Sequence, residues 1–220
     1  MYKTFLTVIL LAAFQYIHSQ STYPEVVFET SEGKFTVRLY EDTPLHSENF
    51  LKLVKEGYYN NQLFHRVIKN FMIQTGDPNS KNAQPGVQLG YGGPNYTIPP
   101  EFQAQYYHKK GALAAARQGD NINPQKASNG SQFYIVEGTV FTNQQLDQIV
   151  QKGQHIPFTP EQRNTYTTIG GYPYLDYSYT VFGEVVQGLD VIDKISVQPT
   201  DPNDRPIQDV RILKAYILKK

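Results

Sequence analysis

The sequence predicts a mainly β protein, a closed antiparallel β-barrel of about eight strands capped by two helices. Short segments of strand character recur along the chain, 14 Pro and 16 Gly residues break it into such segments, and few segments have helical periodicity. A closed barrel is expected rather than an open sheet because closure leaves no exposed strand edge.

The first predicted element is a hairpin. Residues 26–30 are followed by the turn Ser31-Glu32-Gly33, after which apolar and polar residues alternate from Lys34 to Tyr40. This period of two is typical of a half-buried strand after a tight turn. Six further strands are expected, in chain order, over residues 63–68, 71–75, 112–116, 132–136, 180–186 and 210–218.

Two helices are expected to cap the barrel. In the first, Thr43 is placed to cap the N-terminus, Pro44 fits the first helical position, and Gly57 ends the helix. The second is short, covers residues 189–195 and follows Gly188. No internal repeat or low-complexity tract is present, so these elements belong to one domain over residues 21–220.

Residues 142–173 differ from this pattern because they are rich in Gln and Thr. Two capping boxes, Thr142 to Gln145 and Thr159 to Gln162, each predict the start of a helix, and apolar residues at helical spacing follow the first. We expect an inserted helical segment between two strands rather than a second domain, since it is too short to hold its own core.

The composition excludes several classes of function. Twenty basic and twenty acidic residues give a net charge of zero, so we expect no nucleic-acid partner. The absence of Cys excludes disulfides, thiol catalysis and Cys-based zinc sites. The five His residues are not paired at metal-ligand spacing, and no phosphate-binding loop follows the Gly-rich stretch at 90–93. No metal and no cofactor are therefore expected.

The N-terminal residues differ from the rest of the chain. Lys3 precedes the apolar run from Phe5 to Phe14, which has the length of a signal-peptide core and is too short to span a bilayer. Residues 1–20 are therefore predicted to be a cleaved signal peptide, with an uncleaved anchor as the alternative. The mature form is expected to be exported, to the periplasm of a bacterium, without a membrane span.

Several segments resemble the signature motifs of the cyclophilin family. The main ones are Phe64 to Ile68 with Phe71 to Asp77, Asn129 to Ile135, and Leu175-Asp176 followed by Val181 to Gly183. They occur in the family's order across residues 25–218, and only the 142–173 insertion interrupts the match. The resemblance implies a cyclophilin-like barrel and a peptidyl-prolyl cis-trans isomerase that rotates X-Pro bonds in polypeptides.

This reaction needs no nucleophile, cofactor or metal, because the barrier of about 18–20 kcal/mol comes from amide resonance. At the twisted transition state the prolyl nitrogen gains a lone pair. A buried cation that donates a hydrogen bond to it stabilises this state over both planar ground states. Arg suits the role because it stays charged when desolvated. Arg66, in the first motif, is the predicted catalytic residue.

The resemblance also implies the substrate-binding residues. The expected proline pocket consists of Phe71, Met72, Tyr134 and Leu175. The residues expected to position the peptide are Gln74, Ala116, Arg117, Gln132 and Tyr179, of which Gln74 also orients Arg66.

Strand alternation makes two checks on this assignment. It places Gln132 and Tyr134 on one face and directs Phe133 to the core. Phe71 can face the pocket beside Met72 only if a turn or bulge lies near Asn70.

Some positions depart from the family. Many cyclophilins have Phe where this chain has Tyr134, His where it has Tyr179, Asn where it has Arg117, and often Trp where it has Tyr174. These changes leave the proposed catalytic Arg in place and put tight binding of cyclosporin in doubt.

The sequence thus predicts an exported, monomeric isomerase that assists the folding of proline-containing polypeptides. Uncatalysed isomerisation takes tens to hundreds of seconds and can limit folding. One alternative is a non-catalytic peptide-binding module with the same fold. A secreted hydrolase on an unrelated barrel is a second, although no nucleophile-elbow pattern is present.

Overall fold

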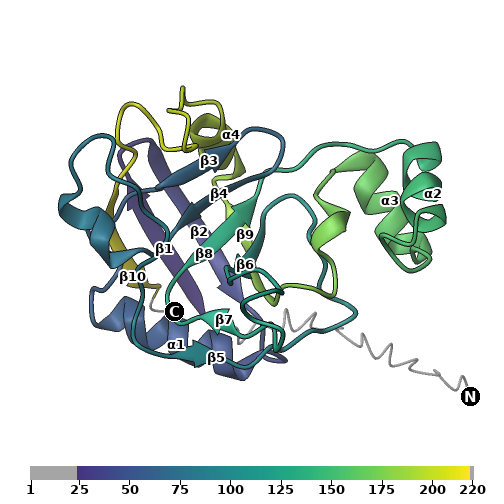
Figure 1. Cartoon of the computed structure of the whole chain (residues 1–220), viewed down its shortest axis with the longest axis horizontal. Coiled ribbons are helices and arrows are strands. Elements are labelled where there is room, and N and C mark those ends of the chain that lie inside the picture. Colours follow the sequence, from purple (N-terminus) through teal and green to yellow (C-terminus); the bar gives the residue numbers. More distant parts are fainter. Residues whose placement is uncertain (1–23, 219–220) are drawn as a thin grey trace, which may run out of the picture.

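Eight strands form the main sheet of the computed structural model, which describes residues 24–218 (Figure 1). They are β1 (Glu25–Thr30), β2 (Gly33–Leu39), β3 (Arg66–Ile68), β4 (Met72–Thr75), β6 (Ala112–Ala115), β8 (Phe133–Val136), β9 (Val181–Gln187) and β10 (Ile212–Ile217). Their order is β10-β1-β2-β9-β6-β8-β4-β3, and neighbouring strands are antiparallel. The eight predicted strands are confirmed, whereas the two-residue pair β5 (Thr97–Ile98) and β7 (Ser128–Asn129) was not predicted.

The closed barrel predicted from the sequence is not confirmed. The sheet is curled, and within residues 24–218 no ladder joins β3 to β10; the pairing at this seam is limited to an isolated bridge between Leu63 and Arg211. Backbone bonds flank the bridge, from Phe64 N–H to Val210 O (2.9 Å) and from Ile212 N–H to Gln62 O (2.8 Å). The N–H of Leu63 itself donates to Ser80 Oγ (3.0 Å), and its carbonyl accepts from Thr75 Oγ1 (2.8 Å).

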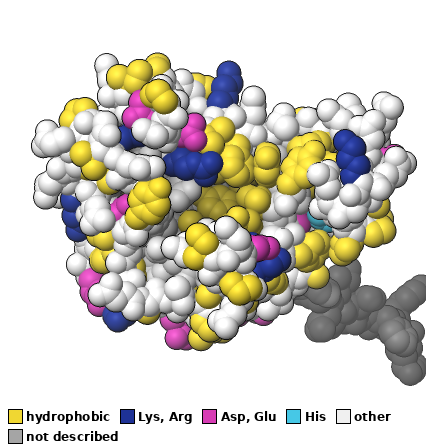
Figure 2. Space-filling model, viewed as in Figure 1, with side chains coloured by type: hydrophobic (Ala, Val, Ile, Leu, Met, Phe, Trp, Pro, Cys, Tyr) yellow, Lys and Arg dark blue, Asp and Glu magenta, His cyan; other side chains and the backbone are white. Residues whose placement is uncertain are grey.

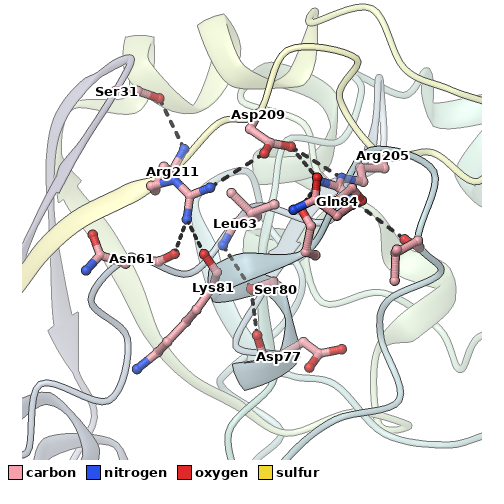
Figure 3. A network of polar contacts seen from close by, with 12 residues as sticks. Ser31, Asn61, Leu63, Asp77, Ser80, Lys81, Gln84, Arg205, Asp209 and Arg211 are labelled. Carbon is pink, nitrogen blue, oxygen red and sulfur yellow. Dashed lines mark hydrogen bonds and ion pairs between the residues drawn. The ribbon is translucent and has the colours of Figure 1, made fainter.

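Three charged residues, Arg205, Asp209 and Arg211, form a seam network over the gap (Figure 3). Arg211 Nη1 donates to the carbonyls of Asn61 (2.5 Å) and Lys81 (2.9 Å). Arg205 Nη2 pairs with Asp209 Oδ1 at 2.8 Å, and Arg205 Nη1 donates to the carbonyl of Gln84 at 2.9 Å. The guanidinium groups thus satisfy backbone acceptors of the loops that pass over the seam.

One side of the sheet covers the main core. Aromatic rings fill it, with Phe50 in edge contact with Phe133 (5.2 Å between centroids) and Phe28 stacked on Phe35 (5.0 Å). Phe133 lies in this core while Tyr134 belongs to the cluster on the other side, as strand alternation predicts. The helices α1 (Pro44–Lys55) and α4 (Leu189–Ser196) close the two ends (Figure 1).

The start of α1 corrects one expectation. Thr43 occupies the N-cap position, but its side chain makes no capping hydrogen bond. The carboxylate of Glu101 instead accepts from the backbone N–H groups of Leu45 and His46, both at 3.0 Å. A carboxylate also suits the positive end of the helix dipole, so a residue distant in sequence provides this cap.

The inserted segment forms a small lobe beside the sheet, between β8 and β9 (Figure 1). Its helices are α2 (Asn143–Gln151) and α3 (Pro160–Thr168), and both predicted capping boxes are present. Leu146, Ile149 and Tyr166 are buried in a cluster of their own, to which Tyr107 from outside the segment contributes. The lobe therefore has a small core that depends on the main body.

The remaining helical turns are η1 (Pro78–Asn82) and η2 (Pro173–Leu175). Across residues 24–218, no helix is long and apolar enough to cross a membrane. The signal peptide predicted over residues 1–20 lies outside the described residues.

Candidate active site

Nine of the ten predicted site residues line one cavity of about 100 Å³ on the side of the sheet that faces the lobe. They are Arg66, Phe71, Met72, Gln74, Ala116, Arg117, Tyr134, Leu175 and Tyr179. Figure 2 shows apolar side chains gathered between the main body and the lobe, with basic side chains beside them. Four separate parts of the chain meet at this cavity, so only the fold brings its residues together.

The hairpin of β3 and β4 supplies the first four of these residues. Its register pairs Arg66 with Gln74 and Ile68 with Met72. Asn70 has a positive φ of 63° and lies in the connecting turn, where Phe71 N–H donates to Ile68 O at 3.1 Å. This turn takes Phe71 out of the strand alternation, as expected, and lets it line the cavity beside Met72.

Arg66 lies at the edge of the cavity and is half-exposed, with 41% of its side chain accessible. Its Nε is 3.5 Å from Asp204 Oδ2, and its guanidinium carbon is 5.8 Å from the ring centroid of Phe71. Among residues 24–218, neither Nη1 nor Nη2 of Arg66 makes a hydrogen bond. The buried cation predicted from the sequence is therefore wrong for the protein without a ligand, because the side chain of Arg66 is half-exposed.

Arg117 is the second cation of the cavity, and its surroundings differ. Its side chain is 4% exposed and lies over the ring of Tyr179, 4.4 Å from the centroid. Nε donates to Ser178 O (2.8 Å), and Nη1 donates to Asp120 Oδ1 (2.6 Å). Arg117 is therefore held by the protein, whereas the Nη groups of Arg66 face the cavity region without such partners.

Gln132 is the one predicted residue that does not line the cavity. It is buried, and its Nε2 donates to the carbonyls of Gly90 (2.9 Å) and Gly92 (2.6 Å). Its Oε1 accepts from Gln74 Nε2 at 3.0 Å. The structure thus places Gln132 behind Gln74, where it fixes the amide of Gln74.

The apolar wall of the cavity is aromatic on two sides. Phe71 packs on Tyr172, which the sequence analysis did not identify, at 4.3 Å between ring centroids. Tyr134 is 4% exposed and contacts Tyr179 edge to face at 6.0 Å. Burial raises the pKa of the Tyr134 hydroxyl well above its ordinary value, so the wall stays uncharged.

A buried polar cluster behind Tyr134 was also missed. His108 Nε2 lies 2.9 Å from the Tyr134 hydroxyl, and His108 Nδ1 lies 2.8 Å from Asp176 Oδ1. Asp176 Oδ2 accepts from Tyr166 (2.7 Å) and contacts His155 Nε2 (3.0 Å). These residues are far apart in sequence, and no spacing rule relates them; only the Leu175-Asp176 motif pointed to one member.

The chemistry available at the cavity is limited. It combines a small space between aromatic and aliphatic side chains with two arginines and the amide of Gln74 at its edges. Nowhere in the described part of the chain do three His, Asp or Glu side chains form a cluster that could hold a metal ion. A small cavity with apolar walls and hydrogen-bond donors at its rim, on a curled eight-stranded antiparallel sheet, is suited to binding a ligand rather than to nucleophilic chemistry.

Comparisons with known proteins agree with this class. The family model for "Cyclophilin type peptidyl-prolyl cis-trans isomerase/CLD" matches residues 25–217. A protein of Staphylococcus saprophyticus named "Putative peptidyl-prolyl cis-trans isomerase" is 34% identical over 189 residues, covering 86% of this chain and 88% of that protein. A protein of the same name from Staphylococcus aureus strain USA300 is 35% identical with the same coverage.

Solved structures are similar as well. A crystal structure of a Cryptosporidium parvum cyclophilin-type peptidyl-prolyl cis-trans isomerase is 25% identical, with a TM-score of 0.65 over 90% of this chain and 99% of that one. The structure of that enzyme in the presence of the dipeptide Ala-Pro has a TM-score of 0.63, with 25% identity and coverage of 89% and 99%. The chain therefore belongs to the cyclophilin-type peptidyl-prolyl cis-trans isomerase family, and it is an enzyme of that activity.

Proposed function

We propose that this isomerase binds the X-Pro segment of a polypeptide with the prolyl ring in the 100 Å³ cavity. Phe71, Met72, Tyr134 and Leu175 would surround the ring, and Arg66 would donate a hydrogen bond to the prolyl nitrogen. The observation that supports this role is that Arg66 lines the cavity while its Nη1 and Nη2 make no hydrogen bond within residues 24–218. Arg117 lies at the same cavity, but its Nε and Nη1 already donate to Ser178, Gln118 and Asp120.

The catalytic effect follows from differential binding. In the planar ground states the prolyl nitrogen shares its lone pair with the carbonyl group and is a poor acceptor. In the twisted state the lone pair is localised, so the bond from Arg66 forms with full strength only there. Charged hydrogen bonds of this kind contribute about 1.5–3 kcal/mol, and the bound peptide strengthens the bond by excluding water from Arg66.

The other residues of the site position the peptide. Gln74 is the cross-strand neighbour of Arg66, and its Nε2 is already engaged by Gln132, so its Oε1 is available to the Arg66 guanidinium or to a peptide N–H. Ala116 is small and lies at the end of β6, where a peptide backbone can approach. Arg117 and Tyr179 form the opposite edge through their cation–π contact.

Export and assistance to folding complete the proposed function. They rest on the signal-peptide prediction for residues 1–20 and on the slow rate of uncatalysed prolyl isomerisation. Substrates would be unfolded or folding exported polypeptides in a bacterial periplasm, and the enzyme would act as a monomer. Mass spectrometry of the mature protein tests this: loss of about twenty N-terminal residues is expected, and a mature chain that retains Met1 would contradict cleavage.

The role of Arg66 is tested by a protease-coupled assay on an Ala-Pro tetrapeptide. Arg66→Ala is expected to lower kcat/KM about 10- to 100-fold, because one charged hydrogen bond in the transition state is lost. Arg163→Ala is the matched control, since Arg163 lies on α3 and pairs with Asp147 in the lobe. Unchanged activity of Arg66→Ala would contradict the mechanism.

A further inference from the structure

The hydroxyl of Tyr134 serves no evident purpose in lining the cavity. The ring itself forms the wall, and a phenyl ring would fill the same space. The hydroxyl is buried and lies 2.9 Å from His108 Nε2. Because buried polar groups need a partner, this contact determines where the hydroxyl, and with it the ring, can lie.

His108 is held from its other side by a carboxylate. Both the backbone N–H and Nδ1 of His108 lie 2.8 Å from Asp176 Oδ1. With Nδ1 donating, Nε2 of a neutral ring is an acceptor, so the Tyr134 hydroxyl donates to it. Two contacts to one carboxylate oxygen fix both the position and the tautomer of His108.

The second oxygen of Asp176 belongs to the inserted lobe. It accepts from the Tyr166 hydroxyl of α3 at 2.7 Å and from His155 Nε2, in the loop between α2 and α3, at 3.0 Å. Burial raises the pKa of Asp176, but the hydrogen bonds from His108 and His155 outweigh it, and the pKa falls to about 2. The carboxylate of Asp176 is therefore held by His108 from the main body and by His155 and Tyr166 from the lobe.

The ring of His155 is fixed by contacts at both of its nitrogens. Its Nδ1 lies 2.5 Å from the carbonyl oxygen of Ile156, an acceptor, and its Nε2 faces the ionised Asp176. Both ring nitrogens of His155 therefore lie beside acceptor oxygens. The pair is almost completely buried, with 1% of each side chain exposed, so its geometry has little freedom.

We propose that the inserted lobe positions the wall of the proline pocket through these five residues, which form a positioning relay. The relay runs from His155 and Tyr166 to Asp176, from Asp176 to His108, and from His108 to Tyr134. Since Tyr134 also contacts Tyr179 on the opposite edge, the relay sets the width of the cavity. The inference rests on the proposed function, because it takes the cavity to hold the prolyl ring.

Under this proposal the lobe is part of the catalytic unit rather than an addition to it. His108, Asp176, His155 and Tyr166 are positioning residues that act through Tyr134. A substitution anywhere in the relay should therefore affect the binding of proline peptides only while the Tyr134 hydroxyl is present. A network that merely stabilises the fold would affect the protein equally with or without this hydroxyl.

A double-mutant cycle of the full-length chain distinguishes these cases, with kcat and KM measured on a proline tetrapeptide for wild type, Asp176→Asn, Tyr134→Phe and the double variant. Asp176→Asn is expected to raise KM about five- to tenfold with little change in kcat, because a displaced wall weakens ground-state and transition-state binding alike. Tyr134→Phe is expected to raise KM by itself. In that background Asp176→Asn should change KM less than about twofold.

The melting temperature supplies the contrasting measurement. It should fall by similar amounts when Asp176→Asn is introduced into either background, because the contacts of Asp176 with the lobe remain in both. An equal change of KM in the two backgrounds, or a fall of kcat alone, would overturn the relay. An inactive wild type would overturn the proposed function and the relay together. An active wild type with equal changes of KM in the two backgrounds would overturn the relay alone.

Tyr166→Phe is the second variant if Asp176→Asn does not fold. It removes one hydroxyl from Asp176 and is expected to raise KM about two- to threefold, with this effect lost in the Tyr134→Phe background. Tyr177→Phe is the matched control, since its hydroxyl accepts a bond from Gln162 within the lobe and takes no part in the relay. The same KM effect from both variants would contradict the proposal.

Discussion

Two polar networks join distant parts of this enzyme, and they differ in where they end. The seam network of Arg205, Asp209 and Arg211 lies where the curled sheet fails to close (Figure 3). Its guanidinium groups donate mainly to backbone carbonyls. The positioning relay lies between the sheet and the lobe, and it consists of side-chain contacts that end on a ring of the cavity.

The difference teaches how a polar network acquires a functional role. Both networks satisfy buried donors and acceptors, and both join segments that are distant in sequence. Only the relay ends on a residue that lines the cavity, so only the relay can change substrate binding without unfolding the protein. The seam network should contribute to stability alone. The following predictions test this division, from the largest expected effect to the smallest.

Asp176→Ala should have the largest effect on stability. Removal of the carboxylate leaves the groups of His108, His155 and Tyr166 that bond to it without their acceptor in the protein interior. A loss of about 3–5 kcal/mol in the free energy of unfolding is expected, because each buried group left unpaired costs about 1–3 kcal/mol. Urea denaturation followed by circular dichroism measures it; a loss below about 1 kcal/mol would show that the relay is not tightly packed.

As the pH falls, the protein should lose stability first through His65 and only at lower pH through Asp176 of the relay. Burial lowers the pKa of His65, next to Arg66, to about 4 from an ordinary 6.5, with Asp77 opposing and Arg66 and Arg205 assisting the shift. The unfolded chain therefore binds a proton that the folded protein resists, so stability is full above pH 6.5 and falls as the pH drops towards 4. The loss at pH 4 is about 3 kcal/mol.

The depressed pKa of Asp176 acts in a lower range. Its contribution is present above the ordinary value of 3.8 and is lost as the pH falls through about 2. Unfolding free energies measured from pH 7 to pH 4 should therefore decrease in wild type and decrease much less in His65→Asn. An equal decrease in both proteins would contradict the assignment to His65.

Arg211→Leu should destabilise the protein without changing its kinetics. The carbonyls of Asn61 and Lys81 lose a donor, and Asp209 loses an ion pair, for an expected loss of about 1–3 kcal/mol. The KM and kcat of the folded fraction should equal those of wild type, because Arg211 is not at the cavity. A change in KM would contradict the claim that the seam network contributes to stability alone.

The smallest effect is expected from the capping boxes of the lobe. Thr159→Ala removes the bond to the Gln162 N–H at the start of α3 (3.1 Å), and Thr142→Ala removes the equivalent bond at α2 (3.2 Å). Each should cost about 1 kcal/mol. Hydrogen exchange should report faster opening of the lobe. If exchange in the lobe is unchanged, the lobe does not open separately from the sheet.

Local signals in the sequence were sufficient for the elements but not for their closure. Segments of strand character predicted the eight strands, alternation directed Phe133 and Tyr134 to opposite faces, and two capping boxes predicted α2 and α3. Closure depends on how far the pairing beside Leu63 extends, and it stops at the isolated bridge to Arg211. No local pattern contains that information.

The site divides in the same way. The family motifs were sufficient to gather nine residues that line one cavity. They could not show that Arg66 is half-exposed, or that the cap of α1 comes from Glu101. The relay was not predicted, because residues such as His108 and His155 belong to no sequence motif and come together only through their shared contact with Asp176. Pairing of this kind arises from tertiary structure alone.

The claim that the cavity rotates X-Pro bonds through Arg66 is tested most directly by exchange NMR on an Ala-Pro peptide. Catalytic amounts of wild type should produce exchange cross-peaks between the cis and trans forms, with no protease in the sample. Arg66→Ala should still bind the peptide through the apolar wall but should produce exchange at least about tenfold slower. Equal exchange rates for Arg66→Ala and wild type would contradict the mechanism.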